Sequence, residues 1–346
     1  MTQIYLIRHA EAEGNLYRRA HGHYDGQITK RGHKQIELLQ KRFENEQIDA
    51  VYSSDLTRAR VTSASIHAPR GLEVSATNRL REVNIGEWED MPWGEIERVH
   101  GEMCKHFNSD PARWDVSDCE PYLSVQKRIT DFITDLAQKH EGKSVAAFSH
   151  GFAIRSFLCG QLGYASDEVT NVPYCDNTAV ALIIWENDKL TLKYHGDNSH
   201  LTTEDSTFAH QTWWRGGKVN ENLHYKLSSE DSAQRAQFIA SGGSINVAPV
   251  EFEAFLDDEP IGALGLDPNK DKDAGFVEYI YVKPELRRSG FGIQLVGQAI
   301  SEYRKMGHNK LRIKADTADT LDFGMKYGFE KVSDSVMEKD ISRNII

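Results

Sequence analysis

Short apolar runs alternate with longer amphipathic stretches over the first two hundred residues of the chain. The short runs are rich in β-branched and aromatic residues, as buried strands are, whereas residues 29–47 repeat apolar positions at helical spacing. Strands that alternate with helices in this way predict an α/β sandwich around a mostly parallel sheet. The predicted strands are residues 3–7, 49–55, 141–151, 177–185 and 189–195; the predicted helices are residues 29–47, a segment through Arg58 and Arg60, and residues 152–162.

This alternation of strands and helices ends just before residue 200. The stretch that follows is polar, contains glycines and shows no regular spacing of apolar residues. Such a stretch is typical of a connection between two units, and 346 residues are more than one hydrophobic core usually serves. We therefore predict a first domain at 1–203, a linker at 204–223 and a second domain at 224–346. Trp213 and Trp214 are large for an exposed linker, so we expect this segment to pack on one of the domains.

The second unit has a different order of elements. Residues 250–266 carry two apolar runs on either side of Asp257-Asp258-Glu259, which predicts a hairpin. A strand, a long helix, a further strand and a short helix with a turn are predicted after it, and together they indicate an α+β domain. These four elements are residues 276–282, 287–306, 309–316 and 320–329.

Composition narrows the class of protein. With 39% hydrophobic and 27% charged residues the chain is typical of a globular protein, and no apolar run approaches the roughly 18 residues of a membrane span. The first residues lack the features of a signal peptide, and the four scattered cysteines form no C-x-x-C pair, which indicates reduced thiols in a cytoplasmic protein. The net charge of −11 argues against nucleic acid and anionic membranes as main partners.

Residues capable of chemistry stand at several predicted strand ends. Arg8 and His9 follow the first strand, Arg58 follows the second, Glu82 lies in the sequence LREVNIGEWE, and His150 ends the strand at 141–151. In a mostly parallel sheet such groups gather at the carboxyl edge of the strands. We therefore expect these five side chains to form one site.

The residue types in this set suit a phosphoryl group. Two guanidiniums can bind phosphate oxygens with paired hydrogen bonds, and two imidazoles can flank the phosphorus, one of them as a neutral nucleophile. The positive field stabilises the charge that develops on the phosphoryl oxygens. A carboxylic acid can protonate the leaving alkoxide, so this chemistry requires no metal.

Residues 1 to about 203 resemble the histidine phosphatase superfamily, which includes cofactor-dependent phosphoglycerate mutases and broad-specificity phosphomonoesterases. The opening Arg8-His9-Ala10-Glu11-Ala12 matches the family pattern Arg-His-Gly-Glu-Thr, and the stretch Ile28 to Gln35 matches a second family element. SSDLTRAR, LREVNIGEW and SHG then follow in the family order. The resemblance implies a three-layer α/β/α phosphoglycerate mutase-like fold.

The resemblance also implies a role for each matched residue. His9 would be the nucleophile that becomes phosphohistidine, and Glu82 would donate a proton to the leaving group and later activate water. The phosphoryl group would be held by Arg8, Arg58 and His150, with Asn15, Arg19 and Thr29 as further phosphate- or substrate-binding residues.

Two departures from the family pattern limit what can be transferred. Ala12 removes a hydroxyl that relatives carry, and Cys119-Glu120-Pro121 replaces a downstream Gly-Glu-Ser. The second change predicts an altered lid at 88–121, whose aromatic residues either line a substrate pocket or pack as ordinary helix residues. Because the lid region is short for a mutase of this family, we expect hydrolysis of a small phosphate ester, with a mutase-like phosphotransferase or a phosphatase of macromolecules as alternatives.

A glycine-containing turn opens the long helix of the second unit. Arg287-Arg288-Ser289-Gly290-Phe291-Gly292 follows a strand, and the first N–H groups of a helix form a natural site for a pyrophosphate. The spacing Arg-x-x-Gly-x-Gly, with KYGFEKV near the end, resembles the GNAT acyltransferases over residues 224 to 341. The resemblance implies an α+β acyl-CoA N-acyltransferase fold, acetyl-CoA as cofactor and an unidentified amine as acceptor.

The same resemblance implies site residues in the second domain. Backbone groups from Arg287 to Ile293 would hold the pyrophosphate, Tyr281 and Val282 would align the pantetheine arm, and Glu278 would act as general base. Gly324 stands where many members carry a tyrosine that protonates the leaving thiolate. A bifunctional phosphatase and N-acetyltransferase is therefore the leading hypothesis, and a phosphatase with a non-catalytic, CoA-sensing module is the alternative. The sequence does not predict the oligomeric state.

Overall fold

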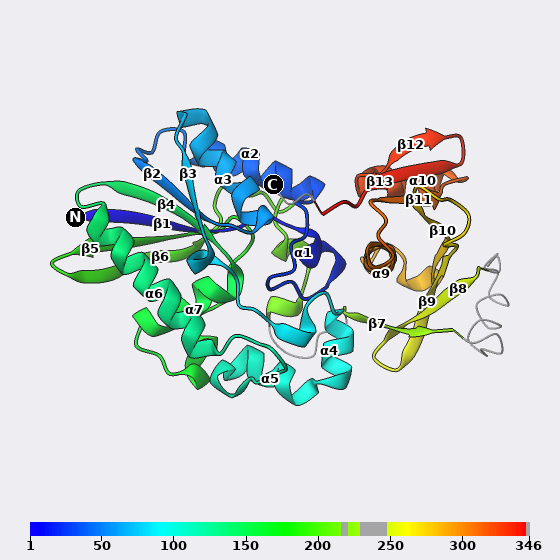
Figure 1. Ribbon diagram of the computed structural model, residues 1–346, viewed down its shortest axis with the longest axis horizontal. Helices are drawn as coiled ribbons and strands as arrows, with labels where there is room; N and C mark the ends of the chain where they lie inside the picture. The colour runs from blue at the N-terminus through cyan, green and yellow to red at the C-terminus, as the bar shows by residue number, and fades with distance from the viewer. Residues whose placement is uncertain (216–220, 229–247, 344–346) are drawn as a thin grey trace.

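The computed structural model describes residues 1–215, 221–228 and 248–343, which are built around two separate sheets (Figure 1). The first sheet has six strands in the order β3-β2-β4-β1-β5-β6. β1 pairs in parallel with β4, β4 with β2 and β2 with β3, whereas β5 and β6 run antiparallel at one edge. The strands are β1 Thr2–Arg8, β2 Ala50–Ser54, β3 Val74–Thr77, β4 Ser144–Ser149, β5 Val180–Glu186 and β6 Lys189–Asp197.

Helices cover both faces of this sheet, so the predicted three-layer α/β/α arrangement is confirmed. Alternate residues of β1 face opposite layers: Ile4 and Leu6 belong to the core shared with α6 and α7, and Tyr5 and Ile7 to the core shared with α2 and α3. The helix predicted at 29–47 ends five residues early. The bounds are α2 Lys30–Arg42, α3 Thr57–Arg70, α6 Tyr122–Lys139 and α7 Gly151–Gln161.

The region predicted as a lid contains short helices, η2 Gly86–Trp88, α4 Trp93–Val99, α5 Gly101–Ser109 and η3 Pro111–Arg113. Both alternatives for its aromatic residues hold, each for different side chains. Trp88 and Trp114 are buried and pack on each other with ring centroids 5.6 Å apart. Trp93 and Phe107 line a cavity.

The second sheet has seven strands in the order β12-β13-β11-β10-β9-β8-β7 and packs on α9 Phe291–Lys305. β10 and β11 pair in parallel over three residues only, although β10 extends to Val282. α10 Ala318–Lys326 completes the α+β unit. The strands are β7 Leu223–Leu227, β8 Val250–Leu256, β9 Glu259–Leu266, β10 Gly275–Val282, β11 Lys310–Lys314, β12 Glu330–Ser333 and β13 Val336–Asp340.

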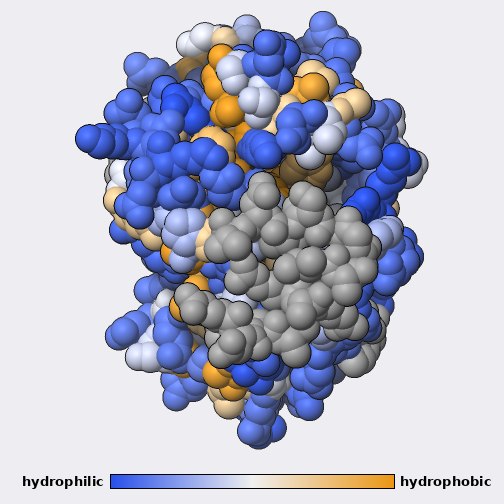
Figure 2. Space-filling model, turned by 90° about the vertical axis from the view of Figure 1, so that its right-hand side faces the viewer, coloured by the Kyte–Doolittle hydropathy of each residue, from blue (hydrophilic) through white to orange (hydrophobic). Residues whose placement is uncertain are grey.

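Figure 2 shows the side of the molecule on which the second unit lies. The described residues on this side form a mostly hydrophilic surface with smaller groups of apolar residues. Among the described residues, no helix combines the length and the apolar character that a membrane crossing needs.

The two units meet where α9 packs on α1 Glu13–Tyr17, a short helix that follows the first strand (Figure 1). A Cβ added at Gly297 would lie 2.4 Å from the Cβ of Tyr17, so the glycine allows the two helices to approach closely. Arg304 of α9 donates to both carboxylate oxygens of Glu13, at 2.9 and 3.0 Å. The start of the first domain therefore contacts the main helix of the second.

The segment after β6 packs on the first domain through hydrogen bonds to Glu11 and Gln35. Thr207 donates to Glu11 and accepts from Gln35, which also donates to the carbonyl of Asp205. Trp214 stacks on Phe208, with ring centroids 5.0 Å apart. The segment contains η5 Phe208–His210 and η6 Trp213–Arg215, and residues 216–220 of the predicted linker lie outside the described residues.

Candidate active site

Three central strands deliver their functional side chains to one edge of the first sheet. Arg8 ends β1 and His9 follows it, Arg58 lies in the first turn of α3 after β2, and His150 lies between β4 and α7. The ring centroids of His9 and His150 are 5.1 Å apart. Relative exposures of 0 to 7% place all four side chains in the interior, although charged and imidazole groups favour water.

His9 is held with one ring nitrogen available for reaction. Its Nδ1 lies 2.7 Å from the carbonyl oxygen of Ala10, which can only accept, so Nδ1 carries the proton and Nε2 keeps a lone pair. Burial, followed by the positive charges of Arg58 and Arg8, holds the pKa of His9 well below its usual value. The imidazole is therefore neutral near pH 7, as a nucleophile must be.

Arg58 is fixed in the site by backbone carbonyls. It donates to the carbonyls of Gly22 at 2.6 Å and Tyr24 at 3.0 Å, and Asp25 lies 3.9 Å away. Arg8 donates to the carbonyl of Cys175. These contacts orient two buried cations without giving either a closely paired carboxylate.

Several buried polar atoms at the site have no partner among the described residues. They are Nε of Arg8 and both ring nitrogens of His150. Burial, then Arg58 and His9, lowers the pKa of His150 well below its usual value, so this ring is also neutral. A neutral imidazole has one N–H donor, so Nε of Arg8 and one ring nitrogen of His150 are donors without an acceptor among the described residues. Because buried polar groups are normally hydrogen-bonded, these two donors indicate a site for an anionic ligand with acceptor oxygens.

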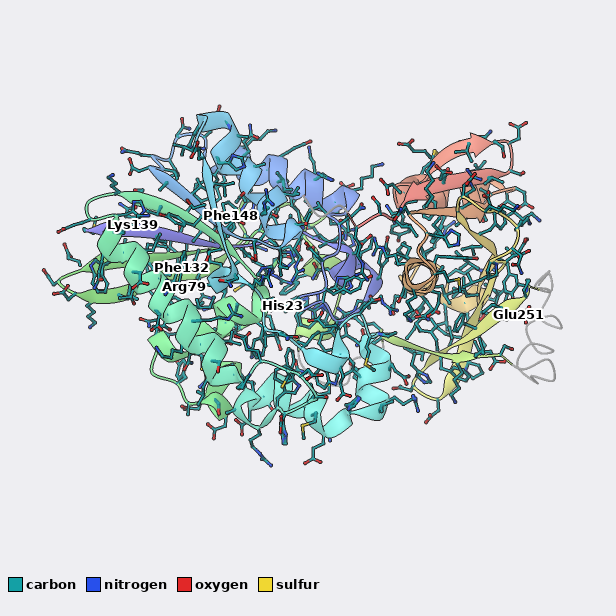
Figure 3. All side chains as sticks on the ribbon, viewed as in Figure 1. His23, Arg79, Phe132, Lys139, Phe148 and Glu251 are labelled. Atoms are coloured by element: carbon teal, nitrogen blue, oxygen red, sulfur yellow. The ribbon has the colours of Figure 1, made fainter. Side chains whose placement is uncertain are left out.

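The carboxylate of Glu82 lies beside these groups, at the N-terminal end of α7. Its Oε2 accepts from the N–H of Phe152 at 3.0 Å, and its Oε1 accepts from Ala153 at 2.8 Å and from Val83 at 3.0 Å. His23, labelled in Figure 3, reaches the carbonyl of Glu82 through Nε2 at 3.0 Å. The carboxylate is thus anchored on a helix N-terminus next to His150, the residue that precedes α7.

A cavity of about 1010 Å³ adjoins the predicted residues and also reaches the lid, the linker and the second domain, although the fully buried His150 is not part of its wall. Arg8, His9, Arg58 and Glu82 are on its wall. Asn15 lines it too, and its Oδ1 accepts from the N–H of Ala12 at 3.1 Å.

Asn177 is a further site residue that the sequence reasoning missed. It donates to the carbonyl of His9 at 2.9 Å, and its Oδ1 has no partner among the described residues. It precedes β5, so the rule that functional groups follow parallel strands could not find it.

The structure corrects two assignments. Arg19 borders the cavity, but its guanidinium is engaged by Asp90, by Gln298 at 2.9 Å and by Ser301 at 3.0 Å. Two of these partners belong to α9, so Arg19 connects the domains. Thr29 caps α2 by accepting from Gly32, and its hydroxyl donates to Glu11 at 2.6 Å. It is a structural residue because both hydrogen-bonding roles of its hydroxyl are in use.

The turn before α9 has the backbone conformation expected of a ligand-binding loop. Arg288 and Gly290 adopt φ angles of 65° and 87°, and a Cβ added at Gly290 would meet nothing within 4 Å. The first N–H groups of α9, from Phe291 to Ile293, have no acceptor within the helix. Arg287 donates to the carbonyl of Val282 at 3.1 Å, and Tyr281 and Val282 are buried. The loop around Ser289 and Gly292 therefore presents an open helix N-terminus.

Two other predicted features of the second domain are less favourable for catalysis. Glu278 forms an ion pair with Lys270, so its carboxylate is not a free base. A side chain added at Gly324 would meet Sδ of Met337 at 2.4 Å, so no tyrosine fits there without repacking. Tyr327 packs against Phe323 with ring centroids 5.0 Å apart.

Comparison with known proteins agrees with both units. The model of the histidine phosphatase superfamily (branch 1) matches residues 4–198, and that of the acetyltransferase (GNAT) family matches residues 218–329. Phosphoserine phosphatase 1 of Hydrogenobacter thermophilus is 30% identical over 58% of this chain and 95% of its own length. Phosphoglycerate mutase-like protein 4 of Arabidopsis thaliana is 32% identical over 58% of this chain and 87% of its own.

Among solved structures, YhfR of Bacillus stearothermophilus superimposes with a TM-score of 0.56 at 28% identity, over 58% of this chain and 99% of its own. The chain belongs to the histidine phosphatase superfamily, branch 1, and carries a GNAT-family domain after its phosphatase domain.

Proposed function

We propose that the first domain hydrolyses phosphate monoesters through a phosphohistidine on His9. Nε2 of His9 attacks phosphorus, and the bond from phosphorus to the ester oxygen breaks. Glu82, in its protonated form, gives its proton to that oxygen, so the alcohol leaves neutral. Water then attacks the phosphohistidine and gives a proton to Glu82, which releases phosphate and restores His9.

The remaining groups stabilise the transferring phosphoryl group. Arg8 and Arg58 oppose the charge on its oxygens, His150 offers a ring nitrogen, and the carboxamide of Asn15 adds a polar contact. No step requires a metal. The observation that supports this proposal most strongly is the presence of buried, unpaired N–H donors of Arg8 and His150 beside a neutral His9, because a buried donor is costly without an acceptor.

The substrate class is inferred from the relatives. A relative named as a phosphoserine phosphatase matches over 201 residues of this chain, which favours hydrolysis of a small-molecule ester over a macromolecular one. A mutase-like phosphotransferase remains the second candidate, because another relative is named as phosphoglycerate mutase-like. The net charge of −11 supports small molecules rather than nucleic acid or a membrane surface as partners, and the four scattered cysteines support a cytoplasmic location.

Phosphate release from O-phosphoserine and from a generic aryl phosphate tests the proposal. The full chain should release phosphate without added metal, and His9→Ala should lower the rate at least about a thousandfold, because covalent catalysis is lost. His67→Ala is the matched control, since His67 lies in α3 away from the cavity. Activity that survives His9→Ala would contradict the mechanism.

For the second domain we propose that the loop from Arg287 to Ile293 binds the pyrophosphate of acetyl-CoA. The open N-terminus of α9 and the separation of β10 from β11 support binding. Transfer to an amine, with Glu278 as base, is the first candidate activity. The ion pair of Glu278 and the blocked position at Gly324 favour the second candidate, a CoA-sensing module without catalysis.

Calorimetry with acetyl-CoA tests whether the second domain binds this cofactor, which both candidate functions require. Gly290→Val should abolish the heat of binding, because φ near 87° is strained for valine and its side chain covers the loop. Gly307→Val, a glycine of equal φ that follows α9 at its far end, is the control. CoA release with a panel of amines would then show catalysis, and binding without release would show sensing.

A further inference from the structure

The cavity above the catalytic groups is larger than a phosphorylated amino acid needs. Its volume of about 1010 Å³ is at the upper end of the roughly 300–1,000 Å³ found for pockets that enclose drug-sized ligands. Arg8, His9 and Arg58 form one part of its wall, and Arg18, Arg155 and Arg215 stand beside the aromatic residues on another part. The volume beyond Arg8, His9 and Arg58 is available to the alcohol part of the ester.

One part of the wall comes from the lid and α7. Phe107 and Phe152 stack with ring centroids 4.6 Å apart and an interplanar angle of 17°, and Trp93 lies 6.0 Å from Phe107. All three line the cavity. They give this part of the wall a flat, apolar character.

A second part comes from the segment that joins the domains. Trp213 packs edge-on against Tyr174 at 5.0 Å and against Phe208 at 5.5 Å, and Trp214 stacks on Phe208. Tyr174, Trp213 and Trp214 line the cavity. The guanidinium of Arg18 lies 5.3 Å from the ring of Trp213, so the ring is supported from the first domain.

The polar atoms of these rings are already satisfied within the protein. Nε1 of Trp213 donates to Gln211 at 2.7 Å, Nε1 of Trp214 donates to the carbonyl of Phe208 at 2.9 Å, and the hydroxyl of Tyr174 donates to Asn108 at 2.7 Å. A ligand can therefore contact these side chains through their ring carbons and not through hydrogen bonds to their polar atoms. Ring surface favours planar aromatic groups, which stack face to face or edge to face.

The second wall also depends on the second domain. Asn222, next to β7, accepts from Nε of Arg18 at 2.9 Å, and Arg18 in turn supports Trp213. Phe208, at the base of the same stack, lies 5.8 Å from the guanidinium of Arg8. The linker thus contacts the catalytic arginine and the organic end of the cavity together.

We infer that the phosphatase acts on phosphate monoesters whose alcohol carries a planar aromatic group, and that Trp213 and Trp214 of the linker are its specificity residues. This inference rests on the proposed hydrolysis of phosphate monoesters. A small polar alcohol would contact the groups around His9 and make few contacts with the ring surfaces that line the cavity. Such an ester is turned over with a lower kcat/KM because it gains no stacking energy.

Three primary alkyl phosphates test this, since their leaving alcohols are similarly basic: 2-(1-naphthyl)ethyl phosphate, 2-cyclohexylethyl phosphate and ethyl phosphate. With the full chain, kcat/KM should be at least about tenfold higher for the naphthyl ester than for the ethyl ester, as one stacked ring provides. The cyclohexyl ester, which is bulky but not planar, should lie between them.

Trp213→Ala should remove most of the naphthyl preference, measured as the ratio of kcat/KM for the naphthyl ester to kcat/KM for the ethyl ester, and Trp213→Phe should restore this ratio. Trp185→Ala removes a tryptophan of β5 that does not line the cavity, and should leave the preference intact. Equal kcat/KM for the three esters, or an equal loss on all three in Trp213→Ala, overturns the inference and leaves the hydrolytic function standing. Absence of hydrolysis of every ester removes the proposed function and the inference with it.

Discussion

Of the contacts between the domains, we expect the ion pair between Glu13 and Arg304 to be the one whose loss lowers the free energy of unfolding most. Both side chains are at most 6% exposed, and two N–H···O bonds of 2.9 and 3.0 Å join them. Burial alone would lower the pKa of Arg304, but the charge of Glu13 more than offsets this and raises it. Removing one partner leaves the other charge buried, which typically costs about 3–5 kcal/mol.

Arg304→Met should therefore lower the free energy of unfolding by about 3–5 kcal/mol, because Glu13 keeps only the N–H of Gln27 as a partner among the described residues. The double variant Glu13→Gln, Arg304→Met should recover a large part of this loss, since no buried charge remains. Urea unfolding of the full chain, followed by far-ultraviolet circular dichroism and by tryptophan fluorescence, measures both.

A matched control is Asp131→Ala, which breaks an exposed pair with Lys127 whose side chains are 49% and 75% exposed. Pairs of this kind contribute at most about 1 kcal/mol. If Arg304→Met costs no more than this control, or the double variant is no more stable than the single one, the reasoning about a buried charge between the domains is refuted.

Three further predictions concern the acid, the pH response and the packing between the domains. Glu82→Gln should slow hydrolysis of alkyl phosphates by about a hundredfold or more and that of an activated aryl phosphate much less, because only the poor leaving group needs a proton; equal losses would contradict its role. Burial, and then the charge of Arg42, lowers the pKa of His200 in the folded chain to about 4. As the pH falls, the unfolded chain therefore binds a proton at this histidine near pH 6.5, whereas the folded chain binds it only near pH 4. The free energy of unfolding should accordingly fall by up to about 3 kcal/mol between pH 6.5 and 4, and this slope should flatten in His200→Gln. Gly297→Ala should destabilise the chain by about 1–3 kcal/mol because its Cβ would lie 2.4 Å from α1, whereas Gly101→Ala, with nothing within 4 Å, should be nearly neutral in thermal unfolding.

Most strands and the helices α2, α3, α7 and α9 could be predicted because apolar runs and helical spacing are clear in these segments, whereas the 18-residue helix α6 was not predicted. The grouping of the candidate residues could be predicted too, since Arg8 ends a parallel strand and Arg58 and His150 follow parallel strands that end at the same edge. Short elements were beyond this reasoning: α1 has five residues, which is less than two helical turns, and no period can be recognised over that length.

The contacts between the domains could not be predicted for a different reason. Arg19, Glu13 and Arg304 are polar residues that a pattern of apolar positions assigns to the surface, and only the fold shows that they face one another. Arg19 was therefore assigned to the phosphate from its place in the family pattern. Besides Asp90, its partners are Gln298 and Ser301, which lie nearly three hundred residues away along the chain.

The segment after residue 203 has a consequence for how this protein can be divided. Asp176 accepts from the hydroxyl of Ser206 and from the N–H of Phe208, and it is the first of the negative charges that favour the ionised form of Arg8. A fragment that ends where the hydrophobic period lapses would keep each of the five proposed catalytic side chains yet lose the groups that hold Asp176 beside Arg8. If such a fragment were inactive, the cause would be the loss of these contacts and not the loss of a catalytic residue. The shortest fragment suited to enzymology therefore ends beyond Phe208, after the last of these contacts.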